Sequence, residues 1–319
     1  MEDMNLLSMT RIKELIHKVS PEAFIIENAP MSKYTSFKAG GSARALIEVK
    51  STEELKSLLQ LFGEEGINHM MLGNGSNTLF KDSGYDGIVI KLSKEFSYVK
   101  LEDNATELNM GESCRVIAGS AALLSVMAKT ILENSLTGFE FASGIPGSFG
   151  GALFMNAGAY GGEMKQIVKR VKAVSPDGRE EKIFSNEEMD FGYRHSILEE
   201  NGYIAVEACL ELKKGSYEDI SAQMKELAQK RNSKQPVNYP SAGSTFKRPE
   251  GYFAGKLVED AGLKGVSVGG AEVSTLHSGF IINKGGATAT DILELIALCQ
   301  NRVYDQFGVE LKPEVRIIG

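Results

Sequence analysis

Residues 142–162 read ASGIPGSFGGALFMNAGAYGG, and the interpretation of the whole sequence starts from this stretch. Seven of the 34 glycines in the chain fall within it. Because glycine has no Cβ, its backbone can approach a phosphate closely and direct N–H groups at the oxygens. The stretch is too long and too rich in glycine for a simple hairpin. We therefore expect a functional segment without regular structure.

A second glycine-rich segment, residues 72–80, reads LGNGSNTLF and follows an apolar run. It lacks the third glycine of a Rossmann fingerprint, and no GxxxxGK[ST] motif occurs in the chain, so a dehydrogenase or NTPase loop is disfavoured. One such loop alone is most often an ordinary tight turn, but two together favour a phosphate cradle. The residues predicted to form it are Gly73, Asn74, Gly75, Ser76, Asn77, Thr78, Ser143, Gly144, Ile145, Gly147, Ser148, Gly150 and Gly151.

The composition is that of a globular enzyme. With 319 residues, 42% of them hydrophobic and 24% charged, the chain can form two or three compact units. A net charge of -7 disfavours nonspecific binding to nucleic acid, which needs clustered cations. No apolar run is long enough to span a membrane, and the acidic start does not resemble a signal peptide. We expect a cytoplasmic protein.

The cysteines and histidines predict no metal centre. Cys114, Cys209 and Cys299 lie far apart in the sequence, so we expect reduced, buried thiols and no disulfide framework. None of the four histidines falls in the two glycine-rich segments, which disfavours covalent attachment of a cofactor. His195 is interpreted as a structural residue and not as a base.

The hydrophobic pattern predicts an α+β fold. A first helix carries Ile12, Leu15, Ile16 and Val19 on one face, and a second begins with a capping box of Ser51 and Glu54. Further helices are predicted near residues 120–133 and 216–231 and around residues 292–303. Strand-like runs lie at residues 43–49, 69–72, 87–92, 168–174, 204–212 and 314–318.

The order of these elements predicts three parts of the chain. Residues 1–29 form a helical extension, residues 30–212 a first domain with subdomains at about 30–97 and 98–212, and residues 213–319 a second domain. We expect the C-terminal tail to return to the active site.

Seven segments, taken in order, resemble the UDP-N-acetylenolpyruvoylglucosamine reductase family. They read YTSFKAGG, LGNGSNTLF, SGIPGSFGGALFMNAGAYGG, FGYRHS, PSAGSTFKRP, GGAEVS and KPEVRIIG, and they span nearly the whole chain. The resemblance implies that residues 30–212 form an FAD-binding module of the vanillyl-alcohol-oxidase type with two α+β subdomains, and that residues 213–319 form an α+β substrate-binding domain. It implies non-covalent FAD, reduced by NADPH, which then reduces the enolpyruvyl ether of a UDP-sugar to UDP-N-acetylmuramate for peptidoglycan.

The resemblance also implies the roles of individual residues. Ser244 is the expected proton donor, while Arg194 and Glu314 hold or polarise the substrate carboxylate. Substrate contacts are expected from Tyr160, Lys234, Arg248 and Arg316. Only residues 195–243 separate Arg194 from Ser244, so the chain resembles the shorter class of the family, which lacks a tyrosine-bearing insertion.

Without the resemblance, each of these residues has a simpler interpretation. Ser244 beside glycine and proline is typical of a turn hydroxyl, Arg194 of a surface ion pair, and Glu314 of a solvated tail. A flavin oxidase that uses oxygen and a non-catalytic nucleotide-sugar sensor are the alternative functions. A monomer is favoured as the oligomeric state.

Overall fold

The computed structural model describes residues 7–102 and 107–319, and the chain divides into two compact units. Unit 1 comprises the residues up to 26 together with 46–74 and 87–229, and unit 2 comprises residues 27–45, 75–86 and 230–319. The chain therefore passes between the units several times. Four elements have one end in each unit, namely β1 (Ile25–Pro30), β2 (Ser42–Val49), β5 (Tyr85–Leu92) and α6 (Tyr217–Lys234).

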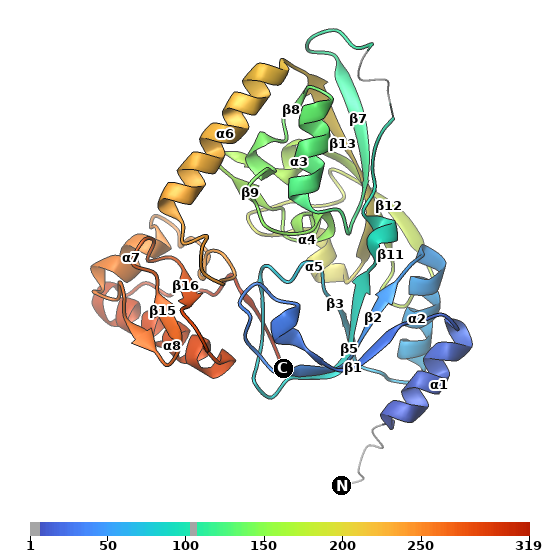
Figure 1. The fold of residues 1–319 in the computed structure, drawn as a ribbon, viewed down its shortest axis with the longest axis horizontal. Helices are drawn as coiled ribbons and strands as arrows, with labels where there is room; N and C mark the ends of the chain where they lie inside the picture. Colours follow the sequence, from blue (N-terminus) through green and yellow to red (C-terminus); the bar gives the residue numbers. More distant parts are fainter. Residues whose placement is uncertain (1–6, 103–106) are drawn as a thin grey trace. The chain divides into compact units, whose positions relative to one another are not determined.

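The remaining elements of unit 1 can be followed in Figure 1 from blue to yellow. Its helices are α1 (Met9–Val19), α2 (Thr52–Glu64), α3 (Leu124–Glu133), α4 (Phe149–Phe154) and α5 (Ile197–Asn201). Its strands are β3 (His69–Met71), β6 (Val99–Leu101), β7 (Ser113–Gly119), β8 (Leu136–Thr137), β9 (Gly158–Ala159), β10 (Gly162–Glu163), β11 (Val168–Val174), β12 (Glu181–Ser185) and β13 (Ile204–Lys214).

Two sheets organise these elements. One has the strand order β1-β2-β5-β3, and the other has the order β12-β11-β13-β7-β6 with β8 paired to β13. The predicted strands at residues 168–174 and 204–212 are confirmed as β11 and β13. The helix predicted near residues 120–133 begins only at Leu124. Ser120, which directly follows β7, still donates its N–H to the carbonyl of Val206 on β13 and so extends the sheet pairing.

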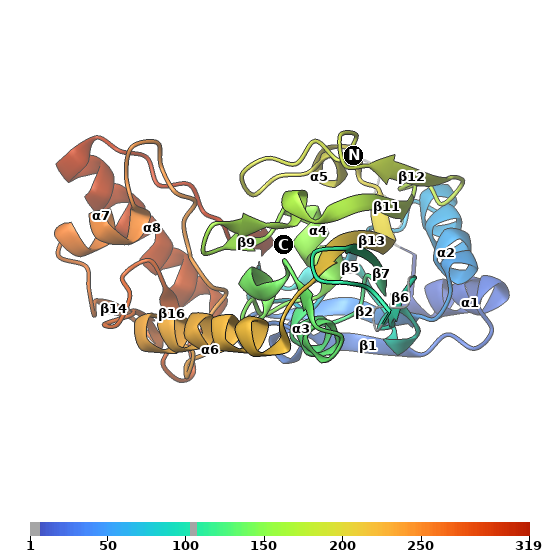
Figure 2. The same ribbon diagram turned by 90° about the horizontal axis from the view of Figure 1, so that it is seen from above.

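Helix α1 packs on α2, as both views show (Figures 1 and 2), and buries Ile12, Leu15 and Ile16 as predicted. Val19, the last residue of the predicted face and of the helix, is exposed. The capping box predicted for α2 is only half formed. The Ser51 hydroxyl accepts the N–H of Glu54 at 3.1 Å, but the Glu54 carboxylate accepts the N–H of Lys50 at 2.7 Å and the hydroxyl of Ser20. The glutamate therefore joins the end of α1 to the start of α2.

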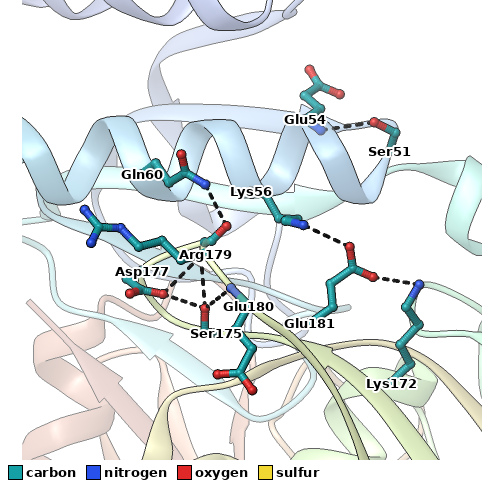
Figure 3. Close-up of polar contacts among 11 residues, drawn as sticks. Ser51, Glu54, Lys56, Gln60, Lys172, Ser175, Asp177, Arg179, Glu180 and Glu181 are labelled. Atoms are coloured by element: carbon teal, nitrogen blue, oxygen red, sulfur yellow. Dashed lines mark hydrogen bonds and ion pairs between the residues drawn. The ribbon is translucent and has the colours of Figure 1, made fainter.

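The other side of α2 faces the turn between β11 and β12 (Figure 3). The Glu181 carboxylate lies between two ammonium groups, with Lys56 Nζ at 3.1 Å and Lys172 Nζ at 2.7 Å. Gln60 donates to the carbonyl of Gly178 at 2.8 Å. Within the turn, the buried Ser175 hydroxyl donates to Asp177 and accepts the N–H groups of Arg179 and Glu180.

We expect this ion pair to stabilise the protein at neutral pH and to be lost in acid. Lys172, and after it Lys56, holds the pKa of Glu181 below its usual value of 4.5. A depressed carboxyl pKa contributes stability above the unfolded pKa, and this is lost as the pH falls through the folded pKa. Glu181→Gln should lower stability by up to about 1 kcal/mol at pH 7, since the pair is partly solvated.

The measurement is the thermal denaturation midpoint of wild type and Glu181→Gln between pH 7 and pH 3. The two midpoints should converge as the pH falls below 4.5. Glu14→Gln, which breaks the exposed pair with Arg11 on α1, is the matched control and should shift the midpoint little. A gap for Glu181→Gln that stays constant down to pH 3 would contradict the ion-pair explanation.

Unit 2 has its own hydrophobic core, formed mainly by its last two helices and a small sheet. Strands β14 (Ser267–Val268), β15 (Ala271–Val273) and β16 (Ile281–Asn283) pair antiparallel, and α7 (Ala254–Asp260) and α8 (Ala289–Phe307) pack with them. Figure 1 shows this part in orange and red. The helix predicted around residues 292–303 is confirmed as α8. The apolar residues of its predicted face are all buried, namely Ile292, Leu295, Ile296, Cys299 and Val303.

All three cysteines are buried, and none forms a disulfide bond with another. Burial raises the thiol pKa of Cys299 to about 12. Among the described helices, none combines the length and apolar character needed to cross a membrane.

Candidate active site

The segment of residues 142–162 has regular structure, and the expectation that it would lack it is wrong. It contains α4 and the hairpin of β9 and β10. Glycine disfavours a helix, but Phe149 and Leu153 of α4 are fully buried in the core of unit 1, and their packing overrides the low propensity. The Gly150 N–H also donates to the Ser120 carbonyl at 2.8 Å.

Within unit 1 the two glycine-rich segments come together. A Cβ built on Gly73 would lie 2.5 Å from the Ser148 hydroxyl oxygen, so glycine allows this approach without displacing that side chain. The predicted cofactor residues of unit 1 are Gly73, Asn74, Ser143, Gly144, Ile145, Gly147, Ser148, Gly150 and Gly151.

Lys91 is a cation beside Gly73 that was not among the predicted cofactor residues. Its ammonium group donates to the Gly73 carbonyl at 2.6 Å, and burial lowers its pKa. The signal was present in the sequence, since Lys91 interrupts the apolar run of β5. A positive charge beside a loop that is predicted to bind phosphates would attract the negatively charged phosphate oxygens.

The rest of the first glycine-rich segment, Gly75, Ser76, Asn77 and Thr78, belongs to unit 2. Gly75 has a left-handed backbone, with φ at +65°, and a Cβ there would lie 2.0 Å from the Tyr34 carbonyl oxygen. Its own carbonyl accepts the Ser36 N–H at 3.0 Å. Residues 34–41, the YTSFKAGG segment, therefore pack directly on the predicted phosphate cradle.

Residues 314–318 form the centre of the candidate site in unit 2. On one side, the Glu314 N–H donates to the Thr245 carbonyl at 2.8 Å, which places Glu314 beside the loop that carries the exposed Ser244. On the other side, Asn77 Nδ2 donates to the Glu314 carbonyl at 3.0 Å. Strand β17 (Arg316–Ile318) then continues parallel to β4 (Thr78–Phe80), with Arg316 opposite Thr78.

Backbone contacts fix the serine loop. Buried Thr245 donates its N–H to the Gly279 carbonyl at 2.8 Å, and its hydroxyl accepts the Ile281 N–H at 3.0 Å. Ser244 therefore precedes a rigidly held residue while its own side chain is exposed. The structure thus brings together, within unit 2, the predicted residues Ser244, Glu314, Arg316, Asn77 and Thr78.

Arg194 and Tyr160 belong to unit 1, and both have left-handed backbones with φ at +53°. Arg194 follows Tyr193 at the tip of a turn closed by hydrogen bonds between Gly192 and His195 in both directions. Its guanidinium carbon lies 5.3 Å from the centre of the Tyr193 ring. Tyr160 occupies the tip of the hairpin of β9 and β10 and is exposed.

The remaining predicted residues lie elsewhere on these units. Arg248 stacks on Phe253, with its guanidinium carbon 4.0 Å from the ring centre. Lys234 is the last residue of α6 and is exposed. The ring nitrogens of His195 lie between 3.5 and 4.0 Å from three carboxylates, an arrangement that fits a structural role. Among residues 7–102 and 107–319, no cluster suitable for a metal ion occurs.

Comparison with known proteins decides the family. Residues 43–183 match the model of an FAD binding domain, and residues 235–318 match that of the C-terminal domain of UDP-N-acetylenolpyruvoylglucosamine reductase. The enzyme of this name from Clostridioides difficile (strain 630) is 50% identical over 307 residues, which cover 96% of each protein. The chain belongs to the UDP-N-acetylenolpyruvoylglucosamine reductase family.

Other members of the reductase family agree. The protein of the same name from Alkaliphilus oremlandii (strain OhILAs) is 49% identical over 302 residues, which cover 95% of this chain and 96% of that one. The crystal structure of the reductase from Thermus caldophilus has a TM-score of 0.77 at 34% identity and covers 93% of this chain and 99% of its own. The chain is therefore an FAD-binding oxidoreductase, and the predicted α+β fold, with a module of the vanillyl-alcohol-oxidase type followed by the C-terminal domain, is confirmed.

The residues of this reductase fit FAD. In the part of the chain that the structure describes, four buried side-chain atoms have no hydrogen-bond partner, and two of them belong to Ser120 and Thr35, residues that lie beside glycines of the predicted loops. Ser120 Oγ faces Gly150 in unit 1, and Thr35 Oγ1 belongs to the residue that packs on Gly75 in unit 2. Buried hydroxyls are normally satisfied, so these two fit a ligand with many acceptor oxygens.

Proposed function

We propose that this protein catalyses the NADPH-dependent reduction of the enolpyruvyl ether of UDP-N-acetylglucosamine-enolpyruvate to UDP-N-acetylmuramate, a precursor of peptidoglycan. The observation that carries the proposal is the path of residues 314–318, which pair with the serine loop through Thr245 and with the first glycine-rich segment through Asn77. The backbone of Glu314 thus links the loop of the proposed proton donor to the proposed FAD loop.

Bound FAD, once reduced by NADPH, would supply the hydride for the terminal carbon of the enolpyruvyl group. The terminal carbon then becomes a methyl group, and the carbon that bears the ether oxygen becomes a carbanion. Its charge spreads onto the neighbouring carboxylate. In our proposal Arg194 binds this carboxylate with two parallel hydrogen bonds, and Glu314 assists in holding or polarising it. Ser244 donates its hydroxyl proton to the carbanion carbon, which completes the lactyl ether.

Four cationic or aromatic groups are proposed to hold the substrate and the nicotinamide nucleotide. The diphosphate and carboxylate of these molecules call for cations and hydrogen-bond donors, and Arg248, with its guanidinium held over an aromatic ring, is suited to bind them. The proposed set is Tyr160, Lys234, Arg248 and Arg316.

The organisation of the chain enters the proposal as well. We infer a helical extension at residues 1–29, an FAD-binding domain at residues 30–212 and a substrate-binding domain at residues 213–319. The short connection of residues 195–243 supports membership of the shorter class of the family. The use of NADPH and a UDP-sugar supports a cytoplasmic location, and we propose a monomer.

The test uses the purified holoenzyme with NADPH and the enolpyruvyl UDP-sugar in air and in D₂O. We expect one lactyl ether formed per NADPH consumed, with one deuterium from solvent at the carbon that Ser244 protonates. Mass spectrometry of the product measures both. NADPH consumption that yields peroxide and no lactyl ether would establish an oxidase instead, and binding without turnover would establish a nucleotide-sugar sensor.

A further inference from the structure

Asn156 lies next to the turn that carries Arg194, and although it falls within the glycine-rich stretch of residues 142–162, no role was predicted for it. It follows α4 in unit 1 and is only 1% exposed, and its backbone is left-handed with φ at +43°. A buried amide in a strained backbone conformation persists only where its surroundings hold it in place. The hydrogen bonds of the Asn156 side chain therefore indicate its role.

Every polar atom of the Asn156 side chain has a hydrogen-bond partner. Its Nδ2 group donates to the Gly192 carbonyl at 2.9 Å and to a Glu163 carboxylate oxygen at 3.0 Å. Its Oδ1 atom accepts the N–H of Lys165 at 2.9 Å. One side chain thus joins the end of α4, the β10 segment and the first residue of the Arg194 turn.

The turn needs such support because of its own backbone. Tyr193 and Arg194 form its tip, and the third position of a four-residue turn with positive φ normally favours glycine or asparagine. An arginine with φ at +53° costs conformational energy there. The Lys165 ammonium also donates to the Phe191 carbonyl at 3.1 Å, and the Ser196 hydroxyl donates to the Phe154 carbonyl at 2.7 Å. The turn is therefore tied at one end to Lys165, which follows β10, and at the other end to Phe154 of α4.

We infer that Asn156 is a positioning residue for the reduction, because its amide fixes the Gly192 carbonyl and thereby the direction in which Arg194 leaves the turn. The inference rests on the proposed role of Arg194. A displacement of about 1 Å at a group that binds the reacting carboxylate is enough to slow a reaction about 100-fold, so this support has a measurable consequence.

The principal variant is Asn156→Gly. Glycine adopts the left-handed backbone without strain, so this variant removes the amide while keeping the local conformation accessible. A second variant, Asn156→Asp, keeps the volume but replaces the donor with an oxygen that faces Glu163 and the Gly192 carbonyl. Ser175→Ala is the matched control, because it also removes a buried side chain with three hydrogen bonds that hold a turn of unit 1 (Figure 3).

We expect both Asn156 variants to keep FAD and to be bleached by NADPH at a rate within about 2-fold of wild type, while kcat for lactyl ether formation falls about 10-fold. Ser175→Ala should lower the melting temperature about as much as Asn156→Gly does, and should leave kcat unchanged. In an Arg194→Ala background, Asn156→Gly should slow the reaction by less than about 2-fold more, because both changes disturb the same group.

The outcomes separate this inference from the proposed function. If Arg194→Ala is slow but Asn156→Gly turns over like wild type, the inference is overturned and the role of Arg194 stands. If the rate reductions caused by Arg194→Ala and Asn156→Gly multiply fully in the double variant, Asn156 acts on the fold in general and the inference is again overturned. If Arg194→Ala itself turns over like wild type, the proposed role of Arg194 fails, and the inference fails with it.

Discussion

Ser244→Ala should leave a yellow protein that NADPH still bleaches at the wild-type rate, while the formation of the lactyl ether falls by about 10²- to 10⁴-fold, the usual contribution of a general acid. A serine hydroxyl is a weak acid, but the carbanion next to an enolpyruvyl carboxylate is a strong base, so the transfer is favourable. The fixed Thr245 backbone means that the loss of one oxygen atom should not disturb the loop.

Stopped-flow absorbance in the flavin band separates the two half-reactions of this variant. Ser241→Ala is the matched control, since it lies in the same loop and pairs through its backbone with Ile282. It should keep both rates. Wild-type product formation by Ser244→Ala would remove Ser244 from the mechanism, whereas slow bleaching by NADPH would show that the change disturbs FAD.

Arg194→Lys should reduce kcat about 10²-fold, comparable to the loss of one preorganised donor at a developing negative charge. Lysine keeps the charge, but a single ammonium cannot form the two parallel hydrogen bonds that a planar guanidinium offers to a carboxylate. Both residues have a Cβ and meet the same cost at φ of +53°, so the comparison isolates the head group.

The measurement is kcat and KM at saturating NADPH. Arg179→Lys, in the turn between β11 and β12 (Figure 3), is the matched control and should behave as wild type. A kcat for Arg194→Lys within about 3-fold of wild type would show that charge alone suffices and that the two-pronged geometry is not used.

The sequence predicted the long elements of this fold well and the short ones poorly. Helix α8 repeats five apolar residues on one face, and strands β11 and β13 are long enough to show their pattern, so local periodicity identifies them. Strand β4 has three residues and is paired with a strand far along the chain. No local pattern can reveal an element that exists because of such a distant partner.

Contacts between residues far apart in the sequence were hidden for the same reason. The Ser51 cap of α2 was predictable because its partner is three residues away, but the bond from Ser20 to Glu54 spans two helices. Helix α4 was missed because glycine hides a helix whose stability comes from packing Phe149 and Leu153. Lys91 and Asn156 were missed because each acts through a carbonyl group that the sequence does not place.

The pairing of β17 with β4 has a consequence for the order of events during synthesis. Asn77 and the Glu314 carbonyl that it contacts are 237 positions apart, and the chain between them includes most of unit 1. The glycine-rich segment at Asn77 therefore leaves the ribosome long before the strand that completes it. Since domains form as the chain emerges, unit 1 can fold first, while β4 waits with an unpaired edge. A nascent chain released before residue 314 would lack both the partner of β4 and the neighbour of the serine loop.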